Sequence, residues 1–376
     1  MNKNFDAIII GGGMIGTATG YYLSKRGLKV LVLEKNFLTA GSTGRCITGI
    51  RQQFSTPASI KTAMESVDIF KNLNKEFGID IEWASSGYMF LAYDEEKVKT
   101  FKSNIERQKQ FGLEVNFLSP EECKKIVPLL NIKDLIGGVW CSSDGQANPF
   151  LVVKGYAKGI EKNGGTILIN TEVKKINTKN GKVKSVITSN GETFSAPVII
   201  NSAGPWAKEI GQMAGLKLPV EPERHEALIT EAVKYEKIPM LVDYRTDGGY
   251  FVQRVTGQFI GCYTPETLIP GKDTGSSLEF LQEMSRRMSR IVPALENVAI
   301  LRQWAGSYCM TPDGNPIIGE TEIDGFYCSV GMSGHGFMLG PALGKYLAQY
   351  ITDSTWPFNL NEFAYGRSFG EREKMA

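Results

Sequence analysis

The first strand, turn and helix constrain this chain more than any other feature. Residues 6–34 read DAIIIGGGMIGTATGYYLSKRGLKVLVLE, which is an apolar strand, a glycine-rich turn, an amphipathic helix and a second strand that ends on an acid. Gly11 allows the tight turn, Gly13 lets the backbone approach a pyrophosphate, and Gly16 lets helix and strand pack closely. Free N–H groups at the start of the helix attract phosphate. The sequence therefore predicts a dinucleotide site at the start of the chain.

The acid that ends the second strand limits which dinucleotide can bind. Glu34 lies where a carboxylate can accept both ribose hydroxyls of an AMP half, and its charge disfavours a 2′-phosphate. NADP is thereby disfavoured. The choice between FAD and NAD stays open at this point.

Length and charge exclude several classes of function. The 376 residues, 42% of them hydrophobic, suffice for two domains with substantial cores. The net charge is +2 and the basic residues are spread among acids, so we expect no nucleic-acid partner. No apolar run approaches the roughly 20 residues that span a bilayer. The chain starts on its first strand without a signal peptide, so we expect a cytoplasmic protein without a membrane span.

Metal and nucleophilic catalysis are poorly supported. Six cysteines are scattered without a CxxC pair, and there are only two histidines, His225 and His335. We expect no metal site and no Ser/His/Asp triad. The chemistry should therefore depend on a cofactor.

The rest of the chain alternates helical and strand patterns. Apolar periodicity, caps and turn residues predict helices near residues 57–77, 95–111, 149–160, 276–291 and 339–351, and the capping box at residues 119–122 predicts one that begins at Pro120. Strands are predicted near residues 83–93, 166–170, 197–201, 224–262, 297–308 and 326–330, with hairpin turns at residues 180–181 and 190–191. This pattern indicates an open sheet interrupted by a β-meander, followed by a mixed sheet.

A second glycine-rich turn lies near the other end of the chain. Residues 331–336, GMSGHG, join an apolar strand to a helix. Such a turn can lie against a planar ring and direct its amides at an acceptor such as the flavin C2=O, where they stabilise charge on the reduced ring. A plain helix cap is the alternative. One extended FAD explains both glycine clusters, which favours FAD over NAD.

Several stretches together resemble one family. GGGMIG with Glu34, NSAGPW at 201–206, RQWAG at 302–306, TPDGNPIIG at 311–319 and GMSGHGF at 331–337 occur in order along the chain. They resemble the D-amino-acid-oxidase-like, or glycine/sarcosine oxidase, family of FAD enzymes. Residues 41–54, GSTGRCITGIRQQF, are most similar to the β subunits of heteromeric dye-linked L-proline dehydrogenases and sarcosine oxidases.

The resemblance implies a fold and its division. We expect an α/β (α+β) protein with a glutathione-reductase-like Rossmann FAD-binding domain and a mixed β-sheet substrate domain. Residues 1–79, 146–217 and 311–376 would form the FAD domain. Residues 80–145 and 218–310 would form the substrate domain.

The same resemblance implies which residues line the FAD site. Pyrophosphate, ribose, adenine and flavin contacts are expected along one extended path. By motif these are Gly11, Gly13, Met14, Ile15, Gly16, Glu34, Lys35, Ser42, Thr43, Arg45, Cys46, Val173, Ala203, Gly204, Trp206, Gly306, Gly334, His335, Gly336, Phe337 and Met338.

The family oxidises an amino acid or N-methyl amino acid by hydride transfer to flavin N5. Arg51 matches an arginine that binds the substrate carboxylate in monomeric sarcosine oxidases, and a structural arginine is the alternative. His225, Tyr250 and His335 are candidates to orient the amine, each against a core or loop role. His335 is expected to contact the flavin through its backbone.

Three departures from the family pattern refine this expectation. Residues 307–309, Ser-Tyr-Cys, replace the carboxylate arginine that glycine and D-amino-acid oxidases carry after Trp-Ala-Gly. Met338 replaces a lysine of monomeric sarcosine oxidases, and Gly306 replaces the cysteine that holds flavin covalently there. FAD should therefore be non-covalent, and a flat substrate could pack against Met338.

We predict FAD-dependent oxidation of a small secondary amino acid, L-proline first and sarcosine next, by the catalytic β subunit of a heteromeric dehydrogenase. An α subunit and an electron acceptor protein are the implied partners. An FMN at the subunit contact is also implied, without covalent attachment because residues 146–149 contain no histidine. A stand-alone glycine or D-amino-acid-type oxidase and a non-catalytic flavoprotein subunit are the alternatives. An NAD(P)H-dependent flavin hydroxylase or reductase is a further alternative. It would need a site for the reductant, and no second G-x-G-x-x-G turn follows a strand in this sequence.

Overall fold

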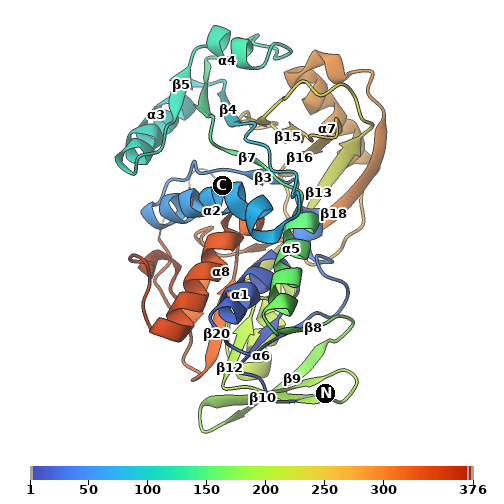
Figure 1. Ribbon diagram of the computed structural model, residues 1–376. Coiled ribbons are helices and arrows are strands. Elements are labelled where there is room, and N and C mark those ends of the chain that lie inside the picture. Colours follow the sequence, from blue (N-terminus) through green and yellow to red (C-terminus); the bar gives the residue numbers. More distant parts are fainter. Residues whose placement is uncertain (1–2, 371, 374–376) are drawn as a thin grey trace.

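Two β-sheets, one above the other in Figure 1, organise the computed structural model. The structure describes residues 3–370, 372 and 373. The lower sheet in this view has six strands and begins with the first strand of the chain. The upper sheet has nine strands and is built from two later parts of the sequence. A cavity is lined by residues of both sheets.

The six-stranded sheet has the order β19-β20-β12-β1-β2-β8. Neighbouring strands are parallel except for the antiparallel pair β19 and β20. The strands are β1 (Ala7–Ile10), β2 (Val30–Leu33), β8 (Thr166–Leu168), β12 (Val198–Asn201), β19 (Ile317–Glu320) and β20 (Phe326–Val330).

Both faces of this sheet are buried, which explains why its strands are apolar throughout. Ile9 and Val32 face four helices, whereas Ile8 and Leu31 face a β-meander and one helix. The four helices are α1 (Met14–Lys25), α2 (Pro57–Phe77), α5 (Pro149–Lys162) and α8 (Gly336–Asp353). The other cover consists of β9 (Val173–Lys179), β10 (Lys182–Thr188), β11 (Thr193–Ser195) and α6 (Ala207–Ala214).

The nine-stranded sheet is mixed. Its order is β17-β13-β16-β15-β14-β4-β6-β5, with β18 paired to β13, and only β4 and β14 are parallel. The strands are β4 (Tyr88–Ala92), β5 (Asn116–Leu118), β6 (Gly137–Cys141), β13 (Glu221–Thr230), β14 (Met240–Asp243), β15 (Tyr250–Gln253), β16 (Phe259–Cys262), β17 (Ile269–Pro270) and β18 (Ile300–Met310).

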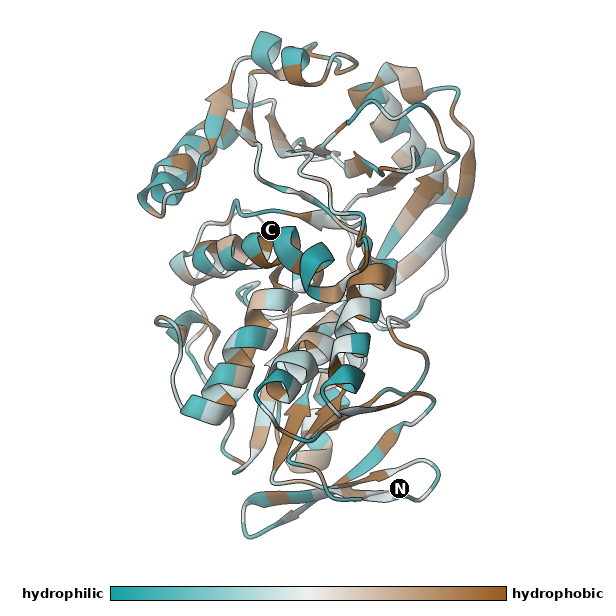
Figure 2. Cartoon of the chain, viewed as in Figure 1, coloured by the Kyte–Doolittle hydropathy of each residue, from teal (hydrophilic) through white to brown (hydrophobic). Residues whose placement is uncertain are grey.

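Helices cover this sheet only in part, so one region faces the cavity. Helix α7 (Leu278–Ile291) packs Met284 and Met288 against one face, beside α4 (Pro120–Ile126). Helix α3 (Glu95–Gln110) packs Phe101 on the other face, and its outer residues are hydrophilic (Figure 2). A ribbon of β3 (Gly49–Ile50) and β7 (Gly145–Gln146) links the two halves. Short 3-10 helices lie at Ser42–Arg45, Gly204–Trp206, Pro293–Leu295 and Asn361–Phe363.

The mixed α/β architecture that the sequence predicts is confirmed. Each predicted helix is present, and Ser119 and Glu122 form the expected capping box. The strands of the two sheets fall within the ranges predicted for the two domains, although the domain boundaries themselves stay a prediction. Among the described residues, no helix combines the length and the apolar character needed to cross a membrane.

Candidate active site

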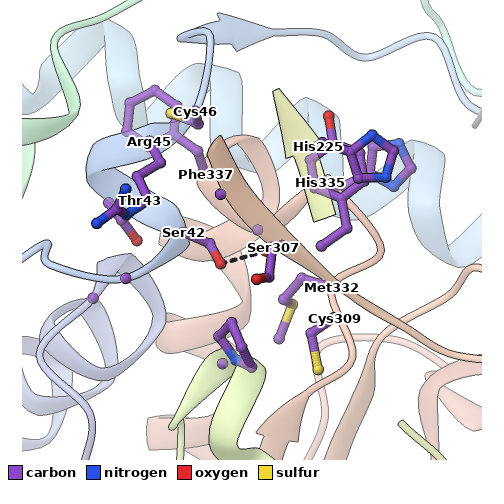
Figure 3. Close-up of a pocket in the computed structure, with 18 of the residues that line it drawn as sticks. Ser42, Thr43, Arg45, Cys46, His225, Ser307, Cys309, Met332, His335 and Phe337 are labelled. Carbon is purple, nitrogen blue, oxygen red and sulfur yellow. Dashed lines mark hydrogen bonds between the residues drawn. The ribbon is translucent and has the colours of Figure 1, made fainter. Parts of the chain in front are cut away.

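One elongated cavity of about 820 Å³ runs from the first glycine turn to the second. Its walls come from the ends of β1 and β2, from residues 40–51, and from the nine-stranded sheet. In Figure 3, Thr43 and Arg45 lie on one side of the view, and His225 and His335 lie on the other. All predicted site residues except Gly16 line the cavity.

The first glycine turn is fixed by close backbone contacts. Gly11 has φ +118°, and a Cβ there would lie 2.3 Å from the carbonyl oxygen of Ser202. A Cβ on Gly16 would lie 2.0 Å from the carbonyl oxygen of Gly11. Gly13 precedes α1, and the Met14 N–H donates to Thr43 Oγ1 at 3.0 Å. Only glycine fits at positions 11 and 16, which explains the spacing of the motif.

The acid after β2 is oriented by the backbone. Glu34 Oε2 accepts from the Gly12 N–H at 2.7 Å, and Oε1 accepts from the Asn36 N–H at 2.8 Å. An ionised carboxylate has about four acceptor sites, so each oxygen has capacity for a further donor such as a ribose hydroxyl. Beside it, the Lys35 ammonium lies 3.2 Å from the centre of the Trp206 ring. Burial lowers the pKa of Lys35.

The loop at residues 42–46 joins the two halves of the site. Ser42 Oγ donates to the Ser307 carbonyl at 2.5 Å, shown as the dashed line in Figure 3. Arg45 donates to the Ala305 carbonyl at 2.8 Å, and Trp304 donates back to the Arg45 carbonyl at 2.9 Å. A Cβ on Gly306 would lie 2.9 Å from Arg45 Cβ. A larger residue at position 306 would therefore push this loop away from β18.

The second glycine turn directs the start of α8 into the cavity. Gly334 has φ +87°, and a Cβ there would lie 2.7 Å from the Tyr308 ring. His335 is the N-cap of α8, and its side chain makes no capping hydrogen bond. The first N–H groups of α8, at residues 336–338, therefore lack the side-chain acceptor that usually caps a helix.

Arg51 is buried in this cavity beside the second turn. Arg51 is only 3% exposed. Its guanidinium carbon lies 4.2 Å from the centre of the Phe54 ring. One nitrogen donates to the Gln53 carbonyl, and Nη2 lies 3.1 Å from His335 Nε2. Burial, with the nearby positive charges of Arg51 and Arg372, lowers the pKa of His335. The neutral imidazole can then accept from Arg51, a side-chain role that the sequence did not predict.

His225, on β13, lines the same cavity with both ring nitrogens unsatisfied. It is 7% exposed, and neither nitrogen has a hydrogen-bond partner among the described residues. Its ring stacks on Tyr308 with 3.9 Å between centroids, because Tyr308 lies two residues beyond Gly306, the cross-strand neighbour of His225. Burial lowers the pKa of His225 to about 4. A neutral imidazole at this position can accept a hydrogen bond from a donor group of a ligand.

Tyr250 differs from His225 because its hydroxyl is already satisfied. The Tyr250 and Tyr308 hydroxyls are 2.8 Å apart, and Cys262 Sγ lies 3.2 Å from Tyr250 Oη. Burial raises the pKa of Tyr250. Among the candidates for orienting an amine, the geometry favours His225.

Two groups of functional neighbours were missed from the sequence. Aromatic and apolar side chains from β4, β14 and the residue after β14 form one wall, namely Tyr88, Phe90, Met240 and Tyr244. The other group is Asp144, which binds Gln52 and Gln53, the residues that follow Arg51. Burial raises the pKa of Asp144 to about 6. Only the strand alternation at residues 88–90 could have indicated a wall; Asp144 carries no comparable signal.

The cavity fits an extended dinucleotide. Each end is formed by a glycine turn that precedes a helix, and neither helix has a hydrogen bond from its N-cap side chain. The Glu34 carboxylate lies at one end. Its volume lies in the range of small-molecule and cofactor sites. The close approaches of Gly11 to Ser202 and of Gly334 to Tyr308 fix the shape of both turns. The residues present therefore suit FAD, and no metal-binding group of three or more ligands occurs in the described part of the chain.

Comparisons with known proteins agree with this geometry. Residues 6–350 match the model of the family described as FAD dependent oxidoreductase. The β subunit of sarcosine oxidase from Rhodobacter capsulatus is 29% identical, over 98% of this chain and 91% of that protein.

Two solved structures have the same fold. L-proline dehydrogenase from P. horikoshii has a TM-score of 0.92 and 39% identity, covering 97% of both chains. Glycine oxidase from Geobacillus kaustophilus has a TM-score of 0.89 and 25% identity, covering 98% of this chain and 100% of that one.

Proposed function

This chain belongs to the FAD-dependent oxidoreductase family, and on that premise we propose that it oxidises a small secondary amino acid, L-proline first and sarcosine next. The observation that carries the proposal is the buried Arg51 in the same cavity as both glycine turns. A buried guanidinium suits a carboxylate, because its planar fork can make two parallel hydrogen bonds. The similarity to L-proline dehydrogenase supports the choice of substrate.

The cofactor contacts in this proposal are those of the predicted residues. Gly11 to Gly16 and the start of α1 would hold the pyrophosphate, Glu34 the ribose, and Val173 the adenine region. Residues 334–338 would contact the flavin pyrimidine edge. When bound, FAD supplies the acceptor for a hydride that leaves the carbon next to the substrate nitrogen. Gly306 leaves no cysteine for a covalent link at that position.

The chain's own residues would bind and orient the substrate. Arg51 binds the carboxylate, and His335 Nε2 accepts from the guanidinium. His225 accepts a hydrogen bond from the amine, which its low pKa of about 4 favours because the imidazole stays neutral. Met338, Tyr88 and Phe90 provide apolar walls for a flat ring. Orientation of this kind supplies much of the acceleration in a hydride transfer.

The substrate proposal is tested by anaerobic reduction of the purified holoprotein, with whatever co-purifies. We expect L-proline to bleach the flavin absorbance fastest and sarcosine next, with D-proline and glycine as comparison substrates. Acid should release FAD. A colourless protein, or bleaching by NADH and by none of the amino acids, would refute the proposal.

We further propose that the chain acts as the catalytic β subunit of a heteromeric dehydrogenase, with an α subunit and an electron acceptor protein. The similarity to a subunit named β supports this assembly. Reoxidation by a dye but not by air is expected. Rapid reoxidation by oxygen would favour the alternative of a stand-alone oxidase, which the glycine oxidase likeness supports.

An FMN at the subunit contact has no support in this chain. Gln146 and Ala147 are buried, and the Gln146 side chain donates to the Gln253 carbonyl at 2.6 Å and accepts from Arg254 at 3.1 Å. These side chains are therefore engaged inside the chain. The proposal contains one flavin, and acid extraction of the complex should yield FAD without FMN.

A further inference from the structure

The loop at residues 51–55, which carries Arg51, depends on contacts from distant parts of the chain. It contains no helix or strand, yet Arg51 to Ser55 are all buried. Helix α3 contributes Gln108, whose amide donates to the Phe54 carbonyl at 2.8 Å. Glu373 accepts from the Ser55 N–H at 2.8 Å. A third region, the turn between β6 and β7, contacts Gln52 and Gln53, the residues that follow Arg51.

That turn places Asp144 against Gln52 and Gln53, the two residues that follow Arg51. The ribbon of β3 and β7 pairs Ile50 with Gly145, and its backbone pairing ends there. Beyond the last backbone pair, the Asp144 carboxylate joins the same two segments through side-chain hydrogen bonds. Its Oδ1 accepts from the Gln52 N–H at 2.9 Å and from Gln52 Nε2 at 2.8 Å, and its Oδ2 accepts from Gln53 Nε2 at 2.9 Å. Asp144 is fully buried.

These bonds connect Asp144 to Arg51 through one shared residue, Gln53. Arg51 itself donates to the Gln53 carbonyl, and Gln53 is the residue whose side chain Asp144 holds. The turn that carries Asp144 is itself fixed, because the Gly87 N–H donates to its carbonyl at 2.9 Å and a Cβ on Gly145 would meet the Ala84 carbonyl at 2.1 Å. Asp144 is thus held by its own backbone contacts while it binds residues 52 and 53.

We propose that Asp144 is a positioning residue for the substrate-carboxylate site, acting through Gln52 and Gln53 on Arg51. The inference rests on the proposed function, because it needs a substrate whose carboxylate binds Arg51. Asp144 does not line the cavity, so it acts on the substrate only through the loop. Its contribution should therefore appear in substrate affinity and depend on Arg51.

The test variant is Asp144→Asn in the full-length holoprotein. Asparagine keeps the size of the side chain but turns one acceptor oxygen into an NH₂ group, so at least one glutamine donor loses its partner. We expect KM for L-proline to rise roughly 10-fold, with kcat changed much less and FAD content unchanged. The thermal stabilisation given by pyrrole-2-carboxylate, a planar carboxylate without an oxidisable ring carbon, should fall in parallel.

Two comparisons separate positioning from general destabilisation. Glu76→Gln is the control: the Glu76 carboxylate accepts from Tyr21 and Lys25, and none of these three residues lines the cavity or belongs to the Arg51 loop. It should lower stability without changing KM. In an Arg51→Ala background, Asp144→Asn should add no further loss of pyrrole-2-carboxylate binding or increase in KM, because the two changes act at one point.

The outcomes distinguish this inference from the proposed function. If no amino acid reduces the wild-type flavin, the proposed function fails. If L-proline is a substrate and Arg51→Ala raises KM but Asp144→Asn leaves it unchanged, the positioning role alone fails. Equal effects of Asp144→Asn with and without Arg51 would also overturn it.

Discussion

The two ends of the cavity are built in different ways. At the nucleotide end, Gly11 and Gly16 are close in sequence and pack tightly against backbone atoms. A Cβ at either position would lie 2.0–2.3 Å from a carbonyl oxygen. At the opposite end, side chains from separate strands and loops converge, as His225 and His335 do. The nucleotide end should tolerate almost no substitution, because its shape depends on contacts between backbone atoms. The second can lose one contact at a time, so single substitutions there should have graded effects.

The largest effect is expected from Gly11→Ala. The new Cβ would lie 2.3 Å from the Ser202 carbonyl, at a φ of +118° that alanine rarely adopts. The turn must therefore move, and we expect most of the FAD to be lost, measured as flavin absorbance per protein after purification.

The matched control is Gly27→Ala, at φ +87° with no atom within 4 Å of the new Cβ. It carries the backbone strain without the clash and should keep its FAD. Full FAD content in Gly11→Ala would show that the nucleotide end is as adaptable as the other.

Arg51→Ala should have the next largest effect, at the substrate end. Removal of one partner from a buried, hydrogen-bonded charge pair typically costs 2–5 kcal/mol, so we expect KM for the amino acid to rise roughly 100-fold. FAD content should stay near that of the wild type. Steady-state kinetics and the visible spectrum measure the two quantities separately.

Arg51→Lys sharpens the result, because lysine keeps the charge but loses the planar fork, and its KM should be intermediate. The exposed Arg26, paired with Asp353, provides the control Arg26→Ala, which should leave KM unchanged. Unchanged saturation by substrate in Arg51→Ala would remove Arg51 from the site.

How much could be predicted follows the same division. The G-x-G-x-x-G turn, Glu34 and the helix caps depend on neighbours within a few tens of residues, so local patterns identified them. The neighbours of Arg51 could not be found this way, because Asp144 lies 92 residues from Gln52 in sequence and Glu373 lies 318 from Ser55. The side-chain partnership of Arg51 with His335 also depends on tertiary packing that no local pattern encodes.

His225→Gln should make the stability of the protein less sensitive to acid. The folded-state pKa of His225 is about 4, below the usual 6.5, so between these values the unfolded chain binds more protons. The free energy of unfolding of the wild type should therefore fall as pH falls, and this residue should account for about 2 kcal/mol between pH 7 and pH 5.

Urea unfolding of both proteins at pH 7, 6 and 5 measures this difference, since carboxyl groups common to both cancel. The same slope in wild type and variant would mean that His225 is not held neutral by burial. It would then be poorly suited to accept a hydrogen bond from a substrate amine.

The smallest effect should come from Tyr250→Phe, beside His225 on the same sheet. The Tyr250 hydroxyl already bonds to Tyr308 and lies near Cys262, so its removal breaks an internal contact and not a ligand contact. A neutral hydrogen bond contributes about 1 kcal/mol net, so stability should fall by that amount while KM changes less than about 3-fold. Urea unfolding and steady-state kinetics give both numbers. A rise in KM comparable to that of an Arg51 variant would mean that Tyr250 leaves Tyr308 to bind the substrate, and the substrate end would then rearrange when it is occupied.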